Sequence, residues 1–239
     1  MQRIAVLLPL WFFLLFWEWA VAGDTQLQFL FAAPSLVGAV AMEELFAMPI
    51  WVHVGTTALE TLTGLLAGTL LGTALGLLFW SNRRLDWLSR PYMIAIGSLP
   101  VFALAPMLII WFGTGLLSKA VMAGFAVMFV AMIQAYEGAH AAAVRFADLP
   151  RALGAPQLRM IRLIIIPAAW QWVLTGFKVN VGLALVGAFI GEFVSAEAGL
   201  GYYILKSGSL YDTPRVIFGL LLMSLLALAL TSVADRLRK

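Results

Sequence analysis

Apolar residues gather in six long runs that are separated by shorter polar stretches. The runs cover residues 4–22, 56–80, 91–112, 119–139, 167–191 and 214–234. Each run is about 20 residues long, which is the length of helix that crosses a hydrocarbon core of roughly 30 Å. The pattern therefore predicts six transmembrane helices, with intervening segments at 24–54, 81–90, 113–115, 140–166 and 192–213.

The composition agrees with this pattern, since 63% of the 239 residues are hydrophobic and only 11% are charged. Soluble domains usually have about 25% charged residues. We therefore expect an all-α integral membrane protein with one domain over residues 1–239. The absence of cysteine excludes disulfide frameworks, thiolate metal sites and cysteine nucleophiles. The two histidines, His53 and His140, are far apart in the sequence, so no metal site is expected.

Basic residues predict the orientation of the spans, because cationic loops are retained in the cytoplasm. If the amino terminus is inside, the cytoplasmic side holds eleven of the fifteen Lys and Arg residues. These are Arg3, Arg83, Arg84, Arg90, Arg145, Arg151, Arg159, Arg162, Arg236, Arg238 and Lys239. Both termini are therefore predicted to be cytoplasmic, and the net charge of +3 reports topology rather than a nucleic-acid partner.

The first span has a second interpretation. Its apolar run ends in Ala20-Val-Ala22, which resembles the cleavage site of a secretory signal. The length of the run and Glu18 near its end favour a retained transmembrane helix.

Glycine recurs at every fourth position of the second span, at Gly64, Gly68, Gly72 and Gly76. On a helix these residues form a stripe where another backbone can approach closely. The stripe predicts a helix-packing seam. Such a seam either slides during transport or provides static packing, and static packing is the simpler interpretation.

The segment 140–166 contains turn and cap residues that predict structure in a loop. Asp148 is a good N-cap, Pro150 is tolerated in a first turn, and Gly154 favours a helix end. Pro156 can then open an amphipathic helix that reaches a turn at Pro167. The result is either a rigid knob that docks in a soluble partner or an interfacial helix that touches only lipid.

This segment resembles the cytoplasmic loop of binding-protein-dependent ABC importer permeases, whose pattern is E-A-A, three residues, G, nine residues, I-x-L-P. Gly154, Ile164 and Pro167 match that spacing, and Asp148 stands at the acidic position. The two alanines of the pattern are replaced by Leu149 and Pro150.

Other segments are similar to the nitrate, sulfonate and taurine branch of these permeases, which is related to the permeases for thiamine precursors. The similarity extends over about residues 34–232. Its motifs are Pro34-Ser35, Leu99-Pro100, Ala105-Pro106, Trp111-Phe-Gly-Thr-Gly115 with Ser118-Lys119, Glu192-Phe193 and Gly199-Leu-Gly-Tyr202.

The resemblance implies a type I ABC importer permease fold with a cytoplasmic coupling helix, in a bacterial inner membrane. It implies a homodimer of permease subunits that encloses the path of a small solute, a nitrate-, sulfonate- or taurine-like anion or the pyrimidine precursor of thiamine. An extracytoplasmic binding protein would deliver the solute. Two cytoplasmic ATPase subunits would bind ATP and Mg, and each would receive the loop residues Asp148, Leu149, Pro150, Arg151, Ala152, Leu153, Gly154, Ala155, Pro156 and Gln157.

No catalysis or cofactor is expected in this chain. The segment 113–119 resembles a phosphate-binding loop, but Ser118 stands where that pattern requires glycine. A secondary transporter or a membrane enzyme without an ATPase is the alternative function. An enzyme needs a cluster of catalytic side chains and a secondary transporter often has inverted repeats, and the sequence shows neither.

Polar residues inside the spans are candidates for the translocation path, because charges are costly in a bilayer. They are Glu60, Gln134, Lys178 and Asn180. Lys178 near mid-membrane either favours anions or forms a structural pair with a glutamate. Glu60 stands where the nitrate and sulfonate branch commonly has a basic residue, which favours a neutral or cationic solute.

The segment after the fifth span predicts an outer gate. Glu192, Ser195, Gly199 and Gly201 combine an acidic group with small residues that suit close backbone packing. An ordinary connecting loop is the alternative. Glu43 and Glu44 either meet a binding protein or are solvated, and solvation is the simpler interpretation.

Overall fold

The computed structural model describes residues 2–97, 101–146 and 156–237, and all of their regular structure is helical. The helices are α1 (Gln2–Ala22), α2 (Thr25–Phe31), α3 (Pro34–Leu45), α4 (Met48–Ser81), α5 (Arg83–Gly97), the 3₁₀ turn η1 (Val101–Leu104), α6 (Ala105–Phe112), α7 (Leu116–Arg145), α9 (Gln157–Met160), the π turn η2 (Ile161–Ile165), α10 (Ile166–Val194), α11 (Leu200–Ser209) and α12 (Thr213–Leu237). The all-α prediction is confirmed for these residues.

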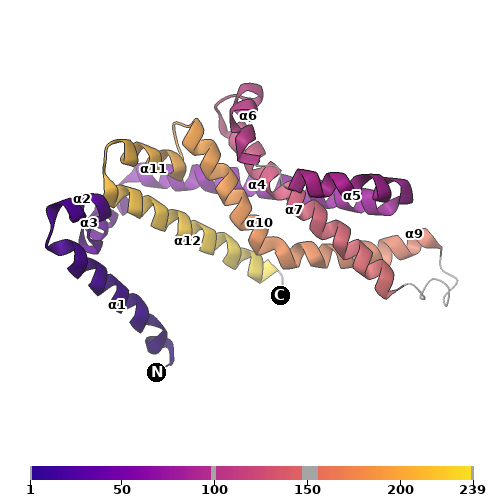
Figure 1. Cartoon of the computed structure of the whole chain (residues 1–239), viewed down its shortest axis with the longest axis horizontal. Coiled ribbons are helices and arrows are strands. Elements are labelled where there is room, and N and C mark those ends of the chain that lie inside the picture. The colour runs from indigo at the N-terminus through magenta and orange to yellow at the C-terminus, as the bar shows by residue number, and fades with distance from the viewer. Residues whose placement is uncertain (1, 98–100, 147–155, 238–239) are drawn as a thin grey trace.

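Three long helices, α4, α7 and α10, form the scaffold of the molecule (Figure 1). Most of the side chains in their shared core are small. The core residues are Leu65, Ala123, Val127, Ala131, Val181, Ala184 and Ala188. Small side chains let helix backbones approach closely, which is the usual way in which helices associate within a membrane.

The glycine stripe of α4 lies directly against the backbone of α7. A methyl group placed on any of the four glycines would overlap a carbonyl oxygen of α7. The glycines 64, 68, 72 and 76 face the carbonyls of Ala120, Gly124, Met128 and Met132, in that order. Because both series advance by four residues, the two helices run parallel and in register along the whole stripe.

Four helices of the described residues are long and apolar enough to cross a membrane, namely α4, α7, α12 and the continuous helix Leu158–Val194. The count rises to five if α2 and α3, which are bent by 50° at a break, form one broken span. The segment 24–54 was expected to be a connection between spans, and it contains these two helices together with the start of α4.

The structure also differs from the single helix expected for residues 91–112. Here α5 ends at Gly97, η1 begins at Val101, and α6 begins at Ala105 with Pro106 in its first turn. Proline cannot donate a backbone hydrogen bond, so it suits the start of a new helix better than the middle of an old one. The apolar run is therefore divided, although its hydropathy is continuous.

Pro167 does not turn the chain, in contrast to the expectation from the sequence. A helix begins at Gln157 directly after Pro156 and continues through η2 into α10. In η2 the N–H of Ile166 bonds to the carbonyl of Ile161, five residues earlier. The wide π turn accommodates the proline ring, which would clash with the preceding turn of a regular α-helix.

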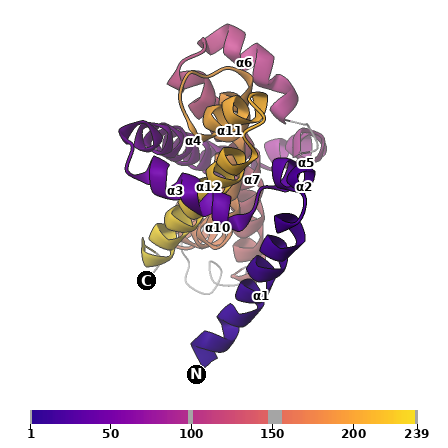
Figure 2. The same ribbon diagram turned by 90° about the vertical axis from the view of Figure 1, so that its left-hand side faces the viewer.

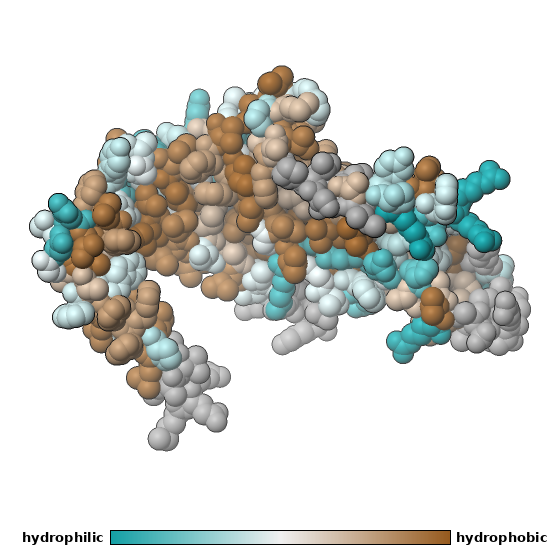
Figure 3. All heavy atoms as spheres, in the orientation of Figure 1, coloured by the Kyte–Doolittle hydropathy of each residue, from teal (hydrophilic) through white to brown (hydrophobic). Residues whose placement is uncertain are grey.

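The molecule is elongated, and α11 and α9 lie toward opposite ends of its long axis (Figure 1). We call these ends the α11 end and the α9 end. Figure 3 shows hydrophobic side chains over much of the visible middle and hydrophilic ones gathered near the α9 end. Helix α1 projects away from the scaffold (Figure 2). It is held near its end by Glu18, which accepts hydrogen bonds from the backbone N–H and the hydroxyl of Ser35 at 2.9 and 2.7 Å.

Candidate functional site

A cluster of buried polar side chains lies at the α11 end of the three-helix scaffold. Glu60 of α4 and Lys119 of α7 are each 2% exposed, and Glu192 of α10 is fully buried. Charged groups at such positions are costly unless they are paired or face a cavity. The cluster therefore marks this end of the scaffold as a candidate functional site.

Glu192 joins α10 to the start of α11 and to α4. One carboxylate oxygen accepts a hydrogen bond from the Thr57 hydroxyl and the other from the backbone N–H of Gly201, both at 2.6 Å. The Thr57 hydroxyl in turn accepts from the N–H of Leu200 at 2.8 Å. One buried side chain thus fixes the segment that follows α10.

His53 of α4 holds the same segment through a second hydrogen bond. Its Nδ1 accepts a hydrogen bond from the N–H of Gly199 at 3.0 Å, and its ring lies near those of Tyr202 and Tyr203. Gly199 has φ of +113°, which favours glycine, and a Cβ atom there would overlap the Glu192 carboxylate. A Cβ atom on Gly201 would lie 2.8 Å from the Phe189 carbonyl oxygen. Close packing therefore requires both glycines.

A cavity of about 450 Å³ opens beside this cluster. Its walls come from α4, from the start of α7 and from the segment that follows α10. The lining residues are Thr56, Glu60, Thr114, Gly115, Leu116, Lys119, Ser195, Ala196, Glu197 and Ala198. The Lys119 ammonium donates to the carbonyl of Thr114. Oε2 of Glu60 is buried and has no hydrogen-bond partner among the described residues.

The other residues predicted for the path lie elsewhere in the scaffold. Gln134 of α7 and the fully buried Asn180 of α10 exchange two hydrogen bonds, at 3.3 and 3.1 Å. Lys178 is exposed on α10. Asn180 precedes Glu192 by twelve residues, or roughly 18 Å of helix. Glu60 is therefore not brought together with these three residues.

A second cavity, of about 370 Å³, lies between α5 and α7 and was not expected from the sequence. It is lined by Arg90, Met93, Ile133, Tyr136, Glu137 and His140. Beside it, Asp86 accepts hydrogen bonds from the Tyr136 hydroxyl and from Arg90. The Tyr136 hydroxyl and then Arg90 hold the pKa of Asp86 below its usual value.

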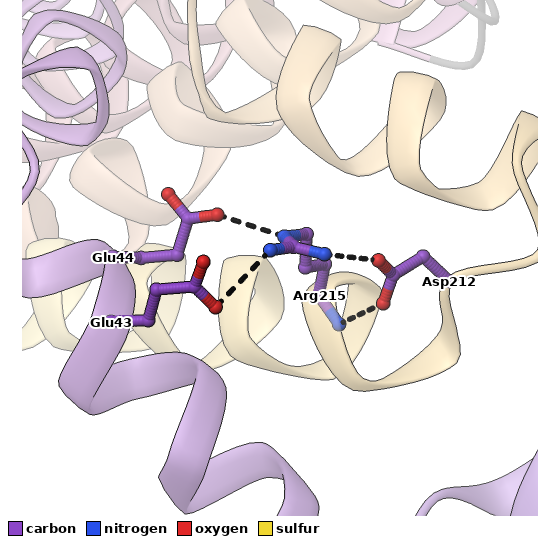
Figure 4. A network of polar contacts seen from close by, with 4 residues as sticks. All are labelled: Glu43, Glu44, Asp212 and Arg215. Atoms are coloured by element: carbon purple, nitrogen blue, oxygen red, sulfur yellow. Dashed lines mark hydrogen bonds and ion pairs between the residues drawn. The ribbon is translucent and has the colours of Figure 1, made fainter.

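Glu43 and Glu44 were expected to be solvated, and the Glu43 side chain is 70% exposed whereas that of Glu44 is only 17% exposed. Both pair with Arg215 (Figure 4). The Arg215 guanidinium lies 2.8 Å from Glu44, 3.4 Å from Glu43 and 2.6 Å from Asp212. These contacts join the end of α3 to the start of α12. The sequence did not suggest this network, because Glu43 and Arg215 are 172 residues apart.

The predicted coupling residues from Asp148 to Ala155 lie outside the described residues. Pro156 is exposed and precedes the first turn of α9, which begins at Gln157. Within the described ranges, no group of three or more acidic or histidine side chains is placed to hold a metal ion.

The fold is similar to that of a chain of the MetNI methionine ABC transporter in an inward-facing conformation. The TM-score is 0.70, and the match covers 81% of this chain and 96% of that one at 19% identity. Among curated proteins, the formylaminopyrimidine transport permease ThiX of Halalkalibacterium halodurans is 30% identical over 176 residues, which are 74% of this chain and 70% of ThiX. The taurine transport permease TauC of Escherichia coli is 23% identical over 95% of this chain and 82% of its own length.

The sequence was also compared with models of whole protein families. The family described as "Binding-protein-dependent transport system inner membrane component" matches residues 64–239, which is more than half of the chain. The matched region contains α7, α10, α11 and α12 and the whole glycine stripe of α4. The chain belongs to this family, and it is a permease subunit of an ABC importer for a small solute.

Proposed function

We propose that the α11 end of this permease faces the binding protein outside the cell and that the α9 end faces the cytoplasm. The distribution of arginine supports this orientation. Arg83 and Arg84 follow α4, Arg145 ends α7, and Arg159 and Arg162 precede α10. Since α4 and α7 run parallel and α10 is antiparallel to them, all five lie at the α9 end. Cationic residues are retained on the cytoplasmic side, so both termini would be cytoplasmic.

We infer six crossings, with α1 and the divided α5–α6 segment added to the four long helices. Helix α1 has 21 residues and a length of roughly 31 Å, which suits a hydrocarbon core of about 30 Å. Two such subunits would enclose one translocation path in a bacterial inner membrane.

Residues 148–157 would dock in a cytoplasmic ATPase subunit and transmit its ATP-driven motion to the spans. The matched positions Gly154, Ile164 and Pro167 support this role. The continuous helix from Gln157 to Val194 supports it as well, because a rigid helix carries a displacement at the α9 end through to Glu192. ATP and Mg would bind to the partner, so this subunit needs no cofactor of its own.

Glu192, Ser195, Gly199 and Gly201 would form the outer gate. Glu192 fixes the start of α11, and Ser195 lines the cavity beside it. Opening the gate would break the bonds of Glu192 to Thr57 and Gly201. The proposed solute is small, either a sulfonate- or taurine-like anion or an aminopyrimidine of the kind named for ThiX.

Substitution of Gly154 tests the complex as a whole. Gly154→Asp is expected to release the ATPase during purification and to lower ATP-dependent uptake about tenfold or more, the loss expected at an interface hot spot. Gly38→Asp is the control, because Gly38 is exposed on α3 with open space around it. If the unmodified permease purifies without an ATPase and Gly154→Asp leaves uptake intact, the proposal is wrong.

A further inference from the structure

The cavity at the α11 end has more acidic than basic side chains in and beside its wall. The carboxylates of Glu60, Glu192 and Glu197 all interact with Lys119, which is the one ammonium at the cavity wall. Three acidic side chains beside one ammonium make the interior less favourable for an anion than for a cation or a hydrogen-bond donor. A low-dielectric wall around them strengthens this preference, because the helices exclude water from the buried side of the cluster.

Within the buried cluster of Glu60, Lys119 and Glu192, one carboxyl oxygen of Glu60 has no hydrogen-bond donor. The two oxygens of Glu192 are taken by Thr57 and Gly201, and the Lys119 ammonium is taken by the carbonyl of Thr114. Oε2 of Glu60 is buried and has no partner among the described residues, and Glu60 is one of the residues that line the cavity. Buried polar atoms nearly always have a partner, so an unfilled acceptor at a cavity wall indicates a ligand that donates.

We propose that this cavity binds an amino or other cationic N–H group of the transported solute, with the Glu60 carboxyl group as the acceptor. The site rests on the proposed function, since it takes the solute that the binding protein releases. Thr56 and Ser195 add hydroxyl groups to the wall, and the apolar atoms of Leu116, Ala196 and Ala198 suit a small ring or alkyl group. Amines and amino-heterocycles fit this wall, whereas a sulfonate or nitrate group is excluded from it.

The same cavity brings the solute into contact with the proposed gate. Ser195 to Ala198 form one wall, and the chain continues directly into Gly199 and Gly201, which are held by His53 and Glu192. A solute that binds Glu60 therefore lies against the segment that must move to let it pass. Glu197 belongs to this moving segment and is exposed, whereas Glu60 is a buried residue of α4.

The electrostatic potential in this cavity can be measured with charged thiol reagents, even when the solute has not been identified. The natural chain has no cysteine, so Ala196→Cys places a single thiol in the cavity wall of the permease–ATPase complex. We expect a cationic methanethiosulfonate to react faster than an anionic one by about tenfold, relative to their ratio on a free thiol. An effect of this size is expected for one unit charge a few ångströms away in a partly desolvated site.

Adding Glu60→Gln to the Ala196→Cys complex should abolish most of this preference. Glu137→Gln is the matched control, since Glu137 is an exposed carboxylate that lines the other cavity. We further expect 4-aminopyrimidine to slow the reaction of the introduced thiol more than ethanesulfonate does. Equal rates of the two reagents, a preference that survives Glu60→Gln, or better protection by ethanesulfonate would each overturn the inference.

The same preparation separates this inference from the function on which it rests. ATPase co-purification and ATP-dependent uptake are measured on the Ala196→Cys complex before labelling. If both are present and the thiol shows no preference for the cationic reagent, the cavity assignment alone fails. If the ATPase is absent from the purified protein, the importer proposal fails first.

Discussion

Single residues at the α11 end act mainly through the hydrogen bonds that they complete. Glu192 is fully buried, and each of its oxygens accepts one bond, from Thr57 and from Gly201. A carboxylate only accepts hydrogen bonds, and the Thr57 hydroxyl and the Gly201 N–H both donate to it. The residue is thus the structural centre of the cluster, and its neighbour Glu60 is the group left open for a ligand.

Replacing Glu192 by alanine should weaken the attachment of α11. The change leaves the buried Gly201 N–H without its acceptor, which costs about 1–3 kcal/mol. It also leaves the Thr57 hydroxyl with only the weaker bond to the His53 carbonyl at 3.2 Å. We expect the midpoint of thermal unfolding, measured on the purified complex, to fall clearly. Glu137→Ala removes an exposed carboxylate of α7 and should leave the midpoint almost unchanged. Equal midpoints for the two variants would show that Glu192 does not hold this segment.

Asp86 provides a pH-dependent contribution at the α5–α7 contact. Its pKa is lowered in the folded protein, first by the Tyr136 hydroxyl and then by Arg90. A lowered carboxylate pKa stabilises the fold above the unfolded pKa of about 3.9, and this contribution is lost as the pH falls through the folded value.

Tyr136→Phe removes the chief cause of the lowered pKa of Asp86. The acid loss of stability at this contact should then begin at a higher pH, close to pH 4, while stability between pH 6 and 8 depends on pH as in the wild type. Thermal unfolding followed from pH 3 to 8 measures this change, and identical acid limbs for variant and wild type would contradict it. The effect is small, because Asp86 is near the surface and is screened by solvent.

At the scale of elements, the sequence predicted the scaffold well and the connections poorly. The four-residue glycine repeat placed a close-packing seam on α4, since a stripe of small residues has little other use on a helix. The division of residues 91–112 was missed, because a continuous apolar run conceals a proline that starts a new helix. The bent pair α2 and α3 was missed because Asp24 to Leu45 combines polar and apolar residues without one long run.

The buried cluster was only partly predictable. Glu60 and Glu192 were singled out from the sequence, whereas Lys119 entered only as part of the motif Ser118-Lys119. Its position at the first residue of the predicted span 119–139 was the available signal. The pairing of Gln134 with Asn180 was not available from spacing, because it depends on how α7 and α10 are rotated about their axes.

The α4–α7 seam predicts opposite effects for two glycine substitutions. Gly68→Ala places a methyl group against the carbonyl of Gly124, and overpacking of this kind costs about 1–3 kcal/mol. Gly182→Ala lies on α10 with open space around it, so it should be neutral or stabilise the helix by up to about 1 kcal/mol. Thermal unfolding of both variants decides the question, and a loss for Gly182→Ala equal to that for Gly68→Ala would argue against the seam.

At the scale of the whole molecule, polar contacts join the peripheral helices to one another: Arg215 joins α12 to α3 through Glu43 and Glu44, and Glu18 joins α1 to α3 through Ser35. Helices α3 and α12 also pack on α4 and α11 in one apolar cluster, whose buried residues are Ala32, Val37, Ile50, Leu200, Tyr203, Phe218 and Leu222. The scaffold itself is held by continuous close packing.

Arg215→Gln should therefore loosen the periphery and leave the scaffold unchanged. The substitution removes the cation that holds Glu43, Glu44 and Asp212 together, and three neighbouring carboxylates then repel one another. Hydrogen exchange on the complex in nanodiscs should become about fivefold faster in α3 and at the start of α12, which corresponds to about 1 kcal/mol for a partly exposed network. Exchange in α7 should stay as in the wild type. Arg84→Gln, at the α9 end, is the control for charge removal, and uniform acceleration across all helices would show instead that Arg215 stabilises the whole fold.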